Sequence, residues 1–199
     1  MIFAFVFIIA LFWGSSSSLL FASDSPPAFA GWKSYTNARF GFSIQYPPDW
    51  QLGKPLTDGL GITLYPPLPK TQMTLSGYLN MIEGKSQDGR QTLAEFATAH
   101  RRIIQDLFAK KSIDLKWERE HALTLGGHPA VQLTFSYRDQ HQTDFVEFHI
   151  FSVGRNEGRG VRIKIPASAR SALMPTISQI LQTYDPGRDQ DAVSPYAQP

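Results

Sequence analysis

Three segments in the C-terminal half of the chain read AVQLTFSYR at 130–138, TDFVEFHIFSV at 143–153 and RGVRIKI at 159–165. In each segment apolar side chains recur at every second position, which is the period of a β-strand with one buried face. The links between the segments are short and consist of glycine and polar residues. Consecutive strands are therefore expected to pair as antiparallel hairpins at the centre of a sheet.

The register of the first two strands follows from placing their apolar side chains on a common face. We expect Phe135 to lie opposite Val146, which leaves residues 139–142 as the hairpin loop. The same alignment places Thr134 opposite Glu147 on the other face of the sheet. A shift by one residue would bury charged side chains, so this pattern constrains the register strongly.

Polar side chains then form a predicted stripe on the face away from the apolar set. From this stripe we take as the candidate binding patch Gln132, Thr134, Glu147, His149, Arg162 and Lys164. One interpretation is a solvated sheet face in which Glu147 and Lys164 form an ion pair worth about 0.2–1 kcal/mol. The alternatives are a surface that binds a ligand or a partner protein, and a metal site built from Glu147 and His149.

The segments around this centre complete the fold prediction. Alternating or apolar segments predict further strands at 39–46, 61–65, 73–82 and 113–124. Thr92 and Glu95 have the spacing of a capping box, which predicts a helix over 92–110. A closing helix is expected to begin near Pro175, because proline suits the first turn of a helix. This order predicts an α+β fold with a central antiparallel sheet flanked by helices.

The N-terminus has the pattern of an export signal. Residues 2–13 form an unbroken run of twelve apolar residues, the size of a signal-peptide core. We expect residues 1–30 to be a signal peptide, cleaved after Ala22 or Ala30, or an uncleaved membrane anchor. A buried N-terminal helix is the alternative. The domain would then span 31–185, followed by a disordered tail at 186–199, and would work in a periplasm, in a lumen or at the outer face of a membrane.

Composition and missing motifs exclude several function classes. The chain has 199 residues and a formal net charge of +2, too small to indicate a nucleic-acid partner. It contains no cysteine, which excludes disulfides, zinc–thiolate sites and cysteine nucleophiles. The sequence has no serine-hydrolase elbow, P-loop or His-Glu-x-x-His motif. We therefore expect neither enzymatic activity nor a cofactor.

Two isolated features receive structural interpretations. His100 lies on the apolar stripe of the predicted helix and is expected to be a buried histidine bonded to the backbone. The basic segment Gly158–Gly160 could touch a phosphate group, but a surface hairpin loop is the simpler interpretation.

The segment from Tyr35 to Trp50, YTNARFGFSIQYPPDW, resembles the opening of PsbP-like domains. The capped helix, the hairpin at 129–153 and the closing helix with Ile177-Ser-Gln-Ile180 continue this resemblance over about residues 32–185. The PsbP-like fold is shared by extrinsic proteins of photosystem II, by Ran-release (Mog-type) proteins and by exported bacterial domains of unknown function. The chain departs from the lipoprotein members because it has no cysteine for a lipid anchor.

The resemblance implies an α/β/α sandwich and a non-enzymatic domain that binds other proteins. We therefore expect an exported accessory domain with a protein partner, such as a membrane complex. Contact with the membrane would occur only through an uncleaved N-terminal segment. The alternatives are a small-ligand or metal carrier, and an enzyme that uses Glu147 and His149 as an acid–base pair.

Overall fold

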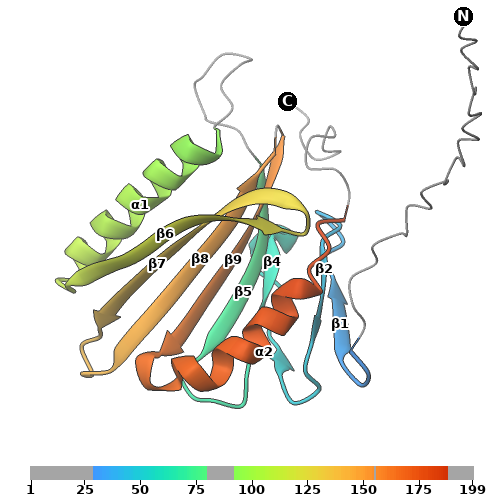
Figure 1. Ribbon diagram of the computed structural model, residues 1–199, viewed down its shortest axis with the longest axis horizontal. Coiled ribbons are helices and arrows are strands. Elements are labelled where there is room, and N and C mark those ends of the chain that lie inside the picture. Colours follow the sequence, from blue (N-terminus) through green and yellow to red (C-terminus); the bar gives the residue numbers. More distant parts are fainter. Residues whose placement is uncertain (1–28, 80–91, 155, 188–199) are drawn as a thin grey trace, which may run out of the picture.

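The computed structural model describes residues 29–79, 92–154 and 156–187. Almost all of the predicted signal segment and most of the predicted tail lie outside these residues. The described chain forms a seven-stranded antiparallel sheet of order β3-β4-β5-β9-β8-β7-β6 and a separate two-stranded sheet, β1-β2 (Figure 1). The strands are β1 (Lys33–Thr36), β2 (Ser43–Tyr46), β3 (Gln51–Leu52), β4 (Gly61–Tyr65), β5 (Gln72–Leu79), β6 (Leu115–Leu125), β7 (His128–Arg138), β8 (Asp144–Val153) and β9 (Glu157–Pro166).

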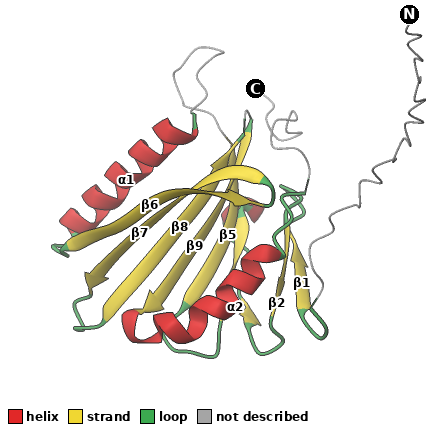
Figure 2. Ribbon diagram, in the orientation of Figure 1, coloured by secondary structure: helices red, strands yellow, loops and turns green. Residues whose placement is uncertain are grey.

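Two helices lie on opposite faces of the large sheet. Helix α1 (Leu93–Lys110) follows β5, and α2 (Arg170–Gln182) follows β9 through the short 3₁₀ helix η2 (Ala167–Ala169) (Figure 2). A second 3₁₀ helix, η1 (Thr57–Gly59), lies between β3 and β4. The predicted α+β class, an antiparallel sheet flanked by helices in an α/β/α sandwich, is confirmed.

The larger core lies between the sheet and α2. There Ile177 and Ile180 of α2 join Val146, Phe148 and Ile150 of β8. The β1–β2 hairpin covers the same side, where Phe40, Phe42 and Ile44 are fully or almost fully buried. Burying side chains of this size contributes about 1.5–3 kcal/mol each, so this face supplies most of the hydrophobic stabilisation.

Helix α1 packs on the other face, over β7 and β8. Its capping box is formed as predicted: the Thr92 hydroxyl accepts from the Glu95 amide at 3.3 Å, and the Glu95 carboxylate accepts from the Thr92 amide at 2.8 Å. Ala97 and Ile104 are its buried residues. In the described part of the chain α1 is the one helix on this face, and no described helix lies over the half of the sheet formed by β9, β5 and β4.

Two element boundaries and two short strands differ from the sequence predictions for local reasons. The strand expected from Arg39 begins only at Ser43, because the Asn37 side chain accepts hydrogen bonds from the Arg39 and Phe40 amides and turns the chain. Helix α2 begins at Arg170, so Pro175 lies inside it and removes one backbone hydrogen bond. The short strands β1 and β3 were not predicted, because their residues are mostly exposed and show no clear alternation.

Candidate functional site

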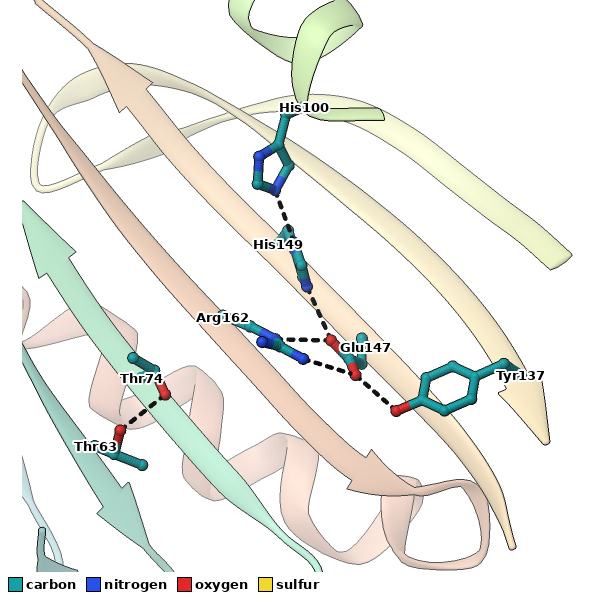
Figure 3. Close-up of polar contacts among 7 residues, drawn as sticks. All are labelled: Thr63, Thr74, His100, Tyr137, Glu147, His149 and Arg162. Carbon is teal, nitrogen blue, oxygen red and sulfur yellow. Dashed lines mark hydrogen bonds and ion pairs between the residues drawn. The ribbon is translucent and has the colours of Figure 1, made fainter. Parts of the chain in front are cut away.

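A buried carboxylate lies at the centre of the sheet face beneath α1. Glu147 of β8 is fully buried and accepts four hydrogen bonds (Figure 3). Tyr137 Oη donates to Oε1 at 2.8 Å and His149 Nε2 to Oε2 at 2.9 Å. Arg162 of β9 donates through Nε to Oε2 at 2.8 Å and through Nη2 to Oε1 at 3.2 Å. A carboxylate has about four lone-pair positions, so all of them are filled.

The hydrogen-bond chain continues from His149 into α1. His149 Nδ1 lies 2.8 Å from Nε2 of His100. Because an ionised Glu147 can only accept, His149 carries its hydrogen on Nε2 and its Nδ1 is an acceptor. His100 must then donate from Nε2, which leaves its Nδ1 as the free acceptor end of the chain. The network thus fixes one tautomer for each ring.

Burial and charge shift the pKa values in this network in a consistent way. Burial alone would raise the pKa of Glu147, but the hydrogen bonds and charges of His149 and Arg162 lower it from 4.5 to about 2. Burial lowers the pKa of His100 from 6.5 to about 4, assisted by His149 and Arg162. Burial also lowers the pKa of His149 despite the opposing hydrogen bond to Glu147. At neutral pH the network therefore consists of an ion pair and two neutral histidines.

A cleft of about 320 Å³ opens beside this network, between α1 and the open half of the sheet. Most of its lining is apolar and comes from α1 and β8. The lining residues are Thr74, Ser76, Tyr78, Phe96, His100, Ile103, Ile104, Leu107, Phe108, Glu147, His149, Ile150, Phe151, Gly160, Val161 and Arg162. Ile103 and Leu107 are 55% and 50% exposed, which is unusual for large apolar side chains of this protein.

The geometry determines which groups a ligand could reach. Glu147 is enclosed by its donors, and both ring nitrogens of His149 are engaged within the network. Arg162 is different, because its side chain is 49% exposed and only two of its N–H groups bond to Glu147. The cleft thus presents one guanidinium edge, the Nδ1 atom of His100 and the hydroxyls of Thr74 and Ser76 against an apolar wall. In the described residues no three His, Asp or Glu side chains are placed to share a metal ion.

Comparison with known proteins identifies the arrangement of elements. No protein-family model and no curated protein sequence matches this chain. The solved structure of cyanobacterial PsbP from Synechocystis sp. PCC 6803 matches with a TM-score of 0.55 and 9% identity, over 86% of this chain and 97% of that one. The chain has the PsbP-like fold. A protein from Bacteroides thetaiotaomicron matches at a TM-score of 0.50 and 14% identity, over 81% of this chain and 50% of that one.

The resemblance found in the sequence between Tyr35 and Trp50 is thus confirmed at the level of the fold. At identities of 9% and 14%, these similarities show the arrangement of helices and strands but assign no role to any side chain. The site of this chain must therefore be interpreted from its own residues. No helix in residues 29–79, 92–154 or 156–187 is long and apolar enough to cross a membrane.

The candidate patch is divided between two faces of the sheet, and the predicted β7–β8 register was wrong by one residue. Phe135 lies opposite Glu147, and Thr134 lies opposite Phe148. Gln132 and Thr134 therefore face the α2 side, away from Glu147, and the loop spans residues 139–143 instead of 139–142. The prediction assumed that β8 has one solvated face, whereas both of its faces are covered.

The β8–β9 register was predicted correctly. Glu147 lies opposite Lys164 and His149 lies opposite Arg162. The partner of Glu147 is nevertheless Arg162, which reaches it diagonally, while Lys164 Nζ lies 4.2 Å from the centre of the Phe145 ring. The expected solvated Glu147–Lys164 pair is thus replaced by a buried pair with Arg162.

Sequence reasoning missed two members of the network. His100 bonds to His149 rather than to the backbone, and Tyr137, which lies in the alternating segment 130–138, donates to Glu147. A signal for the buried face was present: Phe145 and Phe151 share the alternation frame of Glu147 and His149. Two aromatic residues in that frame indicate a covered surface.

The segment Gly158–Gly160 was expected to be a surface hairpin loop. It is instead part of β9. Arg159 is fully buried and donates from Nη2 to the Phe40 carbonyl at 2.8 Å and to Glu157 at 3.1 Å. Gly158 is required because a Cβ there would lie 2.2 Å from the Tyr78 ring. These contacts give the segment a structural explanation in place of the phosphate-binding alternative.

Proposed function

We propose that this protein is an exported, non-enzymatic accessory domain that binds a protein partner of a membrane complex through its α1 side. The observation that carries the proposal is the apolar rim formed by Ile103 and Leu107, which are half-exposed one helical turn apart. They border an open sheet half instead of packing against it. Exposed apolar side chains gathered beside a groove are typical of binding surfaces. The complementary partner surface is an apolar segment that covers this rim.

The state of the network supports a binding role over acid–base catalysis. A general base must hold a lone pair free for the substrate proton. Glu147 has none free, and its pKa of about 2 keeps it ionised. His149 uses both nitrogens inside the network. The alternative of a Glu147–His149 acid–base pair would therefore require the network to open first.

Export is supported by the apolar run at residues 2–13, which has the length of a signal-peptide core. Membrane association would come from the partner complex or from an uncleaved N-terminal segment. A carrier role for a small ligand is the second candidate, and the mostly apolar cleft favours it.

Site-specific photo-cross-linking in the producing cells tests the protein-binding proposal. A photoreactive phenylalanine replaces Leu107 on the rim or, as the matched control, Ser178 on the exposed face of α2. We expect a discrete cross-linked protein from the Leu107 position, absent from the Ser178 position and lost when Ile103 is changed to Glu. Identical products at both positions, or no product at Leu107, would contradict a partner on the α1 side.

A further inference from the structure

Stacked aromatic rings line one end of the cleft. Tyr78 and Phe96 stack with ring centres 5.0 Å apart, and Phe96 and His100 stack at 5.7 Å. Phe151 packs against Phe96 and His100 from the floor. Rings locked in this way form an end wall that lies within the covered region between α1 and the sheet.

The floor of the cleft is hollow because two neighbouring strands carry very small side chains. Gly160 of β9 lies opposite Ser76 of β5. A Cβ on Gly160 would lie 3.2 Å from the Ser76 hydroxyl oxygen, so any larger residue at Gly160 would fill the space. The resulting volume of about 320 Å³ falls at the lower end of the range of about 300–1,000 Å³ that is typical of small-molecule sites.

Polar groups converge on one side of this hollow. The hydrogen bonds of Arg162 to Glu147 use Nε and one Nη2 hydrogen and leave its Nη1 amino group for a ligand. Thr74 lies opposite Arg162 across the β5–β9 pair, and its hydroxyl shares one hydrogen bond with Thr63 at 3.0 Å. Of the charged residues that line the cleft, Arg162 and Glu147 offset each other, and Arg162 alone presents an unused hydrogen-bonding edge.

We propose that this cleft binds a small amphipathic carboxylate, with its apolar body along α1 and its carboxylate on the free edge of Arg162. The planar guanidinium matches the geometry of a carboxylate, and a hydrogen bond between two charged groups is stronger than one between neutral groups. The one free guanidinium edge can donate to a single carboxylate. The apolar wall of Ile103, Ile104, Leu107 and Phe108 suits an alkyl or aryl body. This inference goes beyond protein binding and does not depend on it.

A series of ligands of equal chain length tests the role of the carboxylate. The purified protein is titrated with octanoate, 1-octanol and octyltrimethylammonium while amide shifts are followed by ¹H–¹⁵N NMR. We expect octanoate to shift amides of α1, β5 and β9 and to bind about tenfold tighter than 1-octanol, because only octanoate forms the charged hydrogen bond. The cation should bind more weakly than the alcohol.

Variants that fill the cleft test its location. Gly160→Val and Ser76→Leu each place methyl groups in the hollow without removing a charge, and both side chains are compatible with a strand. We expect each variant to weaken octanoate binding at least about tenfold, whereas Ser171→Leu on the exposed part of α2 should leave it unchanged. Using two filling variants keeps the test valid if one of them fails to fold.

Several results would overturn the proposal. These are no octanoate binding to the wild-type protein, equal affinity for octanoate and 1-octanol, and shifts confined to residues outside the cleft. Undiminished binding by a folded Gly160→Val or Ser76→Leu variant would also do so. The photo-cross-linking result is independent of each, so failure of one proposal leaves the other to be judged on its own data.

Discussion

Glu147 shows how a single buried charge can be accommodated in a sheet. Removing an ionised carboxylate from water is costly unless charged and hydrogen-bonded partners replace the water. Tyr137, His149 and Arg162 fill every acceptor position of the carboxylate, and the half-exposed Arg162 keeps part of its own hydration. The network holds β7, β8, β9 and α1 together by directional bonds. Its physical effect is to fix one arrangement of these elements, more than to add net stability.

The histidine pair makes the stability of the protein depend on pH. Both folded-state pKa values lie below 6.5, so their contribution to the free energy of unfolding is present above pH 6.5 and is lost as the pH falls below it, for His100 down to about 4. Glu147 contributes in a lower window, between 4.5 and about 2. We expect the stability to fall from pH 6.5 to 4.5, and His100→Gln, which keeps a donor to His149 but does not titrate, to reduce this fall.

Urea unfolding across this pH range measures the effect. His141→Gln, in the exposed hairpin loop, is the matched control and should retain the wild-type slope of stability against pH. A wild-type slope in His100→Gln would show that His100 is not held neutral by the fold.

At the scale of the element, α1 depends on its capping box. Thr92→Ala removes the side-chain acceptor for the Glu95 amide and should lower the free energy of unfolding by about 1 kcal/mol. Thr98→Ala makes the same chemical change in the middle of α1, where the hydroxyl only bonds back to the Ala94 carbonyl, and should have little effect. Chemical denaturation and amide exchange in the first turn measure both. Equal losses in the two variants would mean that the cap does not stabilise α1 specifically.

Gly77 and Gly160 lie on neighbouring strands, and we expect them to differ in how well they tolerate an added methyl group. A Cβ at Gly77 would lie 2.3 Å from the fully buried Phe40 ring, whereas at Gly160 its nearest neighbour would be the Ser76 hydroxyl at 3.2 Å. We expect Gly77→Ala to lower the free energy of unfolding by about 1–3 kcal/mol, because the ring cannot move without disturbing the core. Gly160→Ala should cost much less in the same denaturation experiment. A tolerated Gly77→Ala would show that the core under the β1–β2 hairpin can readjust.

The elements themselves were largely predictable from the sequence, but which face of each strand is buried was not. The alternation in 143–153 located β8, and Thr92 and Glu95 located α1, because these signals are local. The register of β7 against β8 failed because the rule that charged residues face solvent does not apply where partners enclose them. Those partners, Tyr137 and His100, come from another strand and from a helix distant in sequence. Only the packed structure brings them to Glu147.

At the scale of the whole molecule, the two faces of the sheet differ in how completely other elements cover them. The α2 face is sealed by α2 and by the β1–β2 hairpin, and there the two ends of the described chain meet. Ser43 and Asp185 exchange backbone hydrogen bonds at 2.8 and 3.0 Å. Among the described residues, the α1 face is covered by one helix, which lies over β7 and β8. The packed core on the α2 face supplies most of the hydrophobic stabilisation. The α1 face can therefore hold a cleft, a half-exposed arginine and an apolar rim.

Because the two faces are separate, the contact between β2 and the segment after α2 can be weakened without affecting the cleft. The buried Thr183 hydroxyl accepts from the Gln45 amide at 2.9 Å and donates to the Ile180 carbonyl at 2.7 Å. Thr183→Val keeps the shape of the side chain but leaves the Gln45 amide without this acceptor. The free energy of unfolding should fall by about 1–3 kcal/mol, and the Gln45 amide should exchange faster. Thr124→Val, on an exposed position of β6, is the matched control and should be nearly neutral. If the Gln45 amide stayed protected in Thr183→Val, the hairpin would be held by its apolar contacts alone. If the amide shifts of α1, β5 and β9 also changed, the two faces would not be independent.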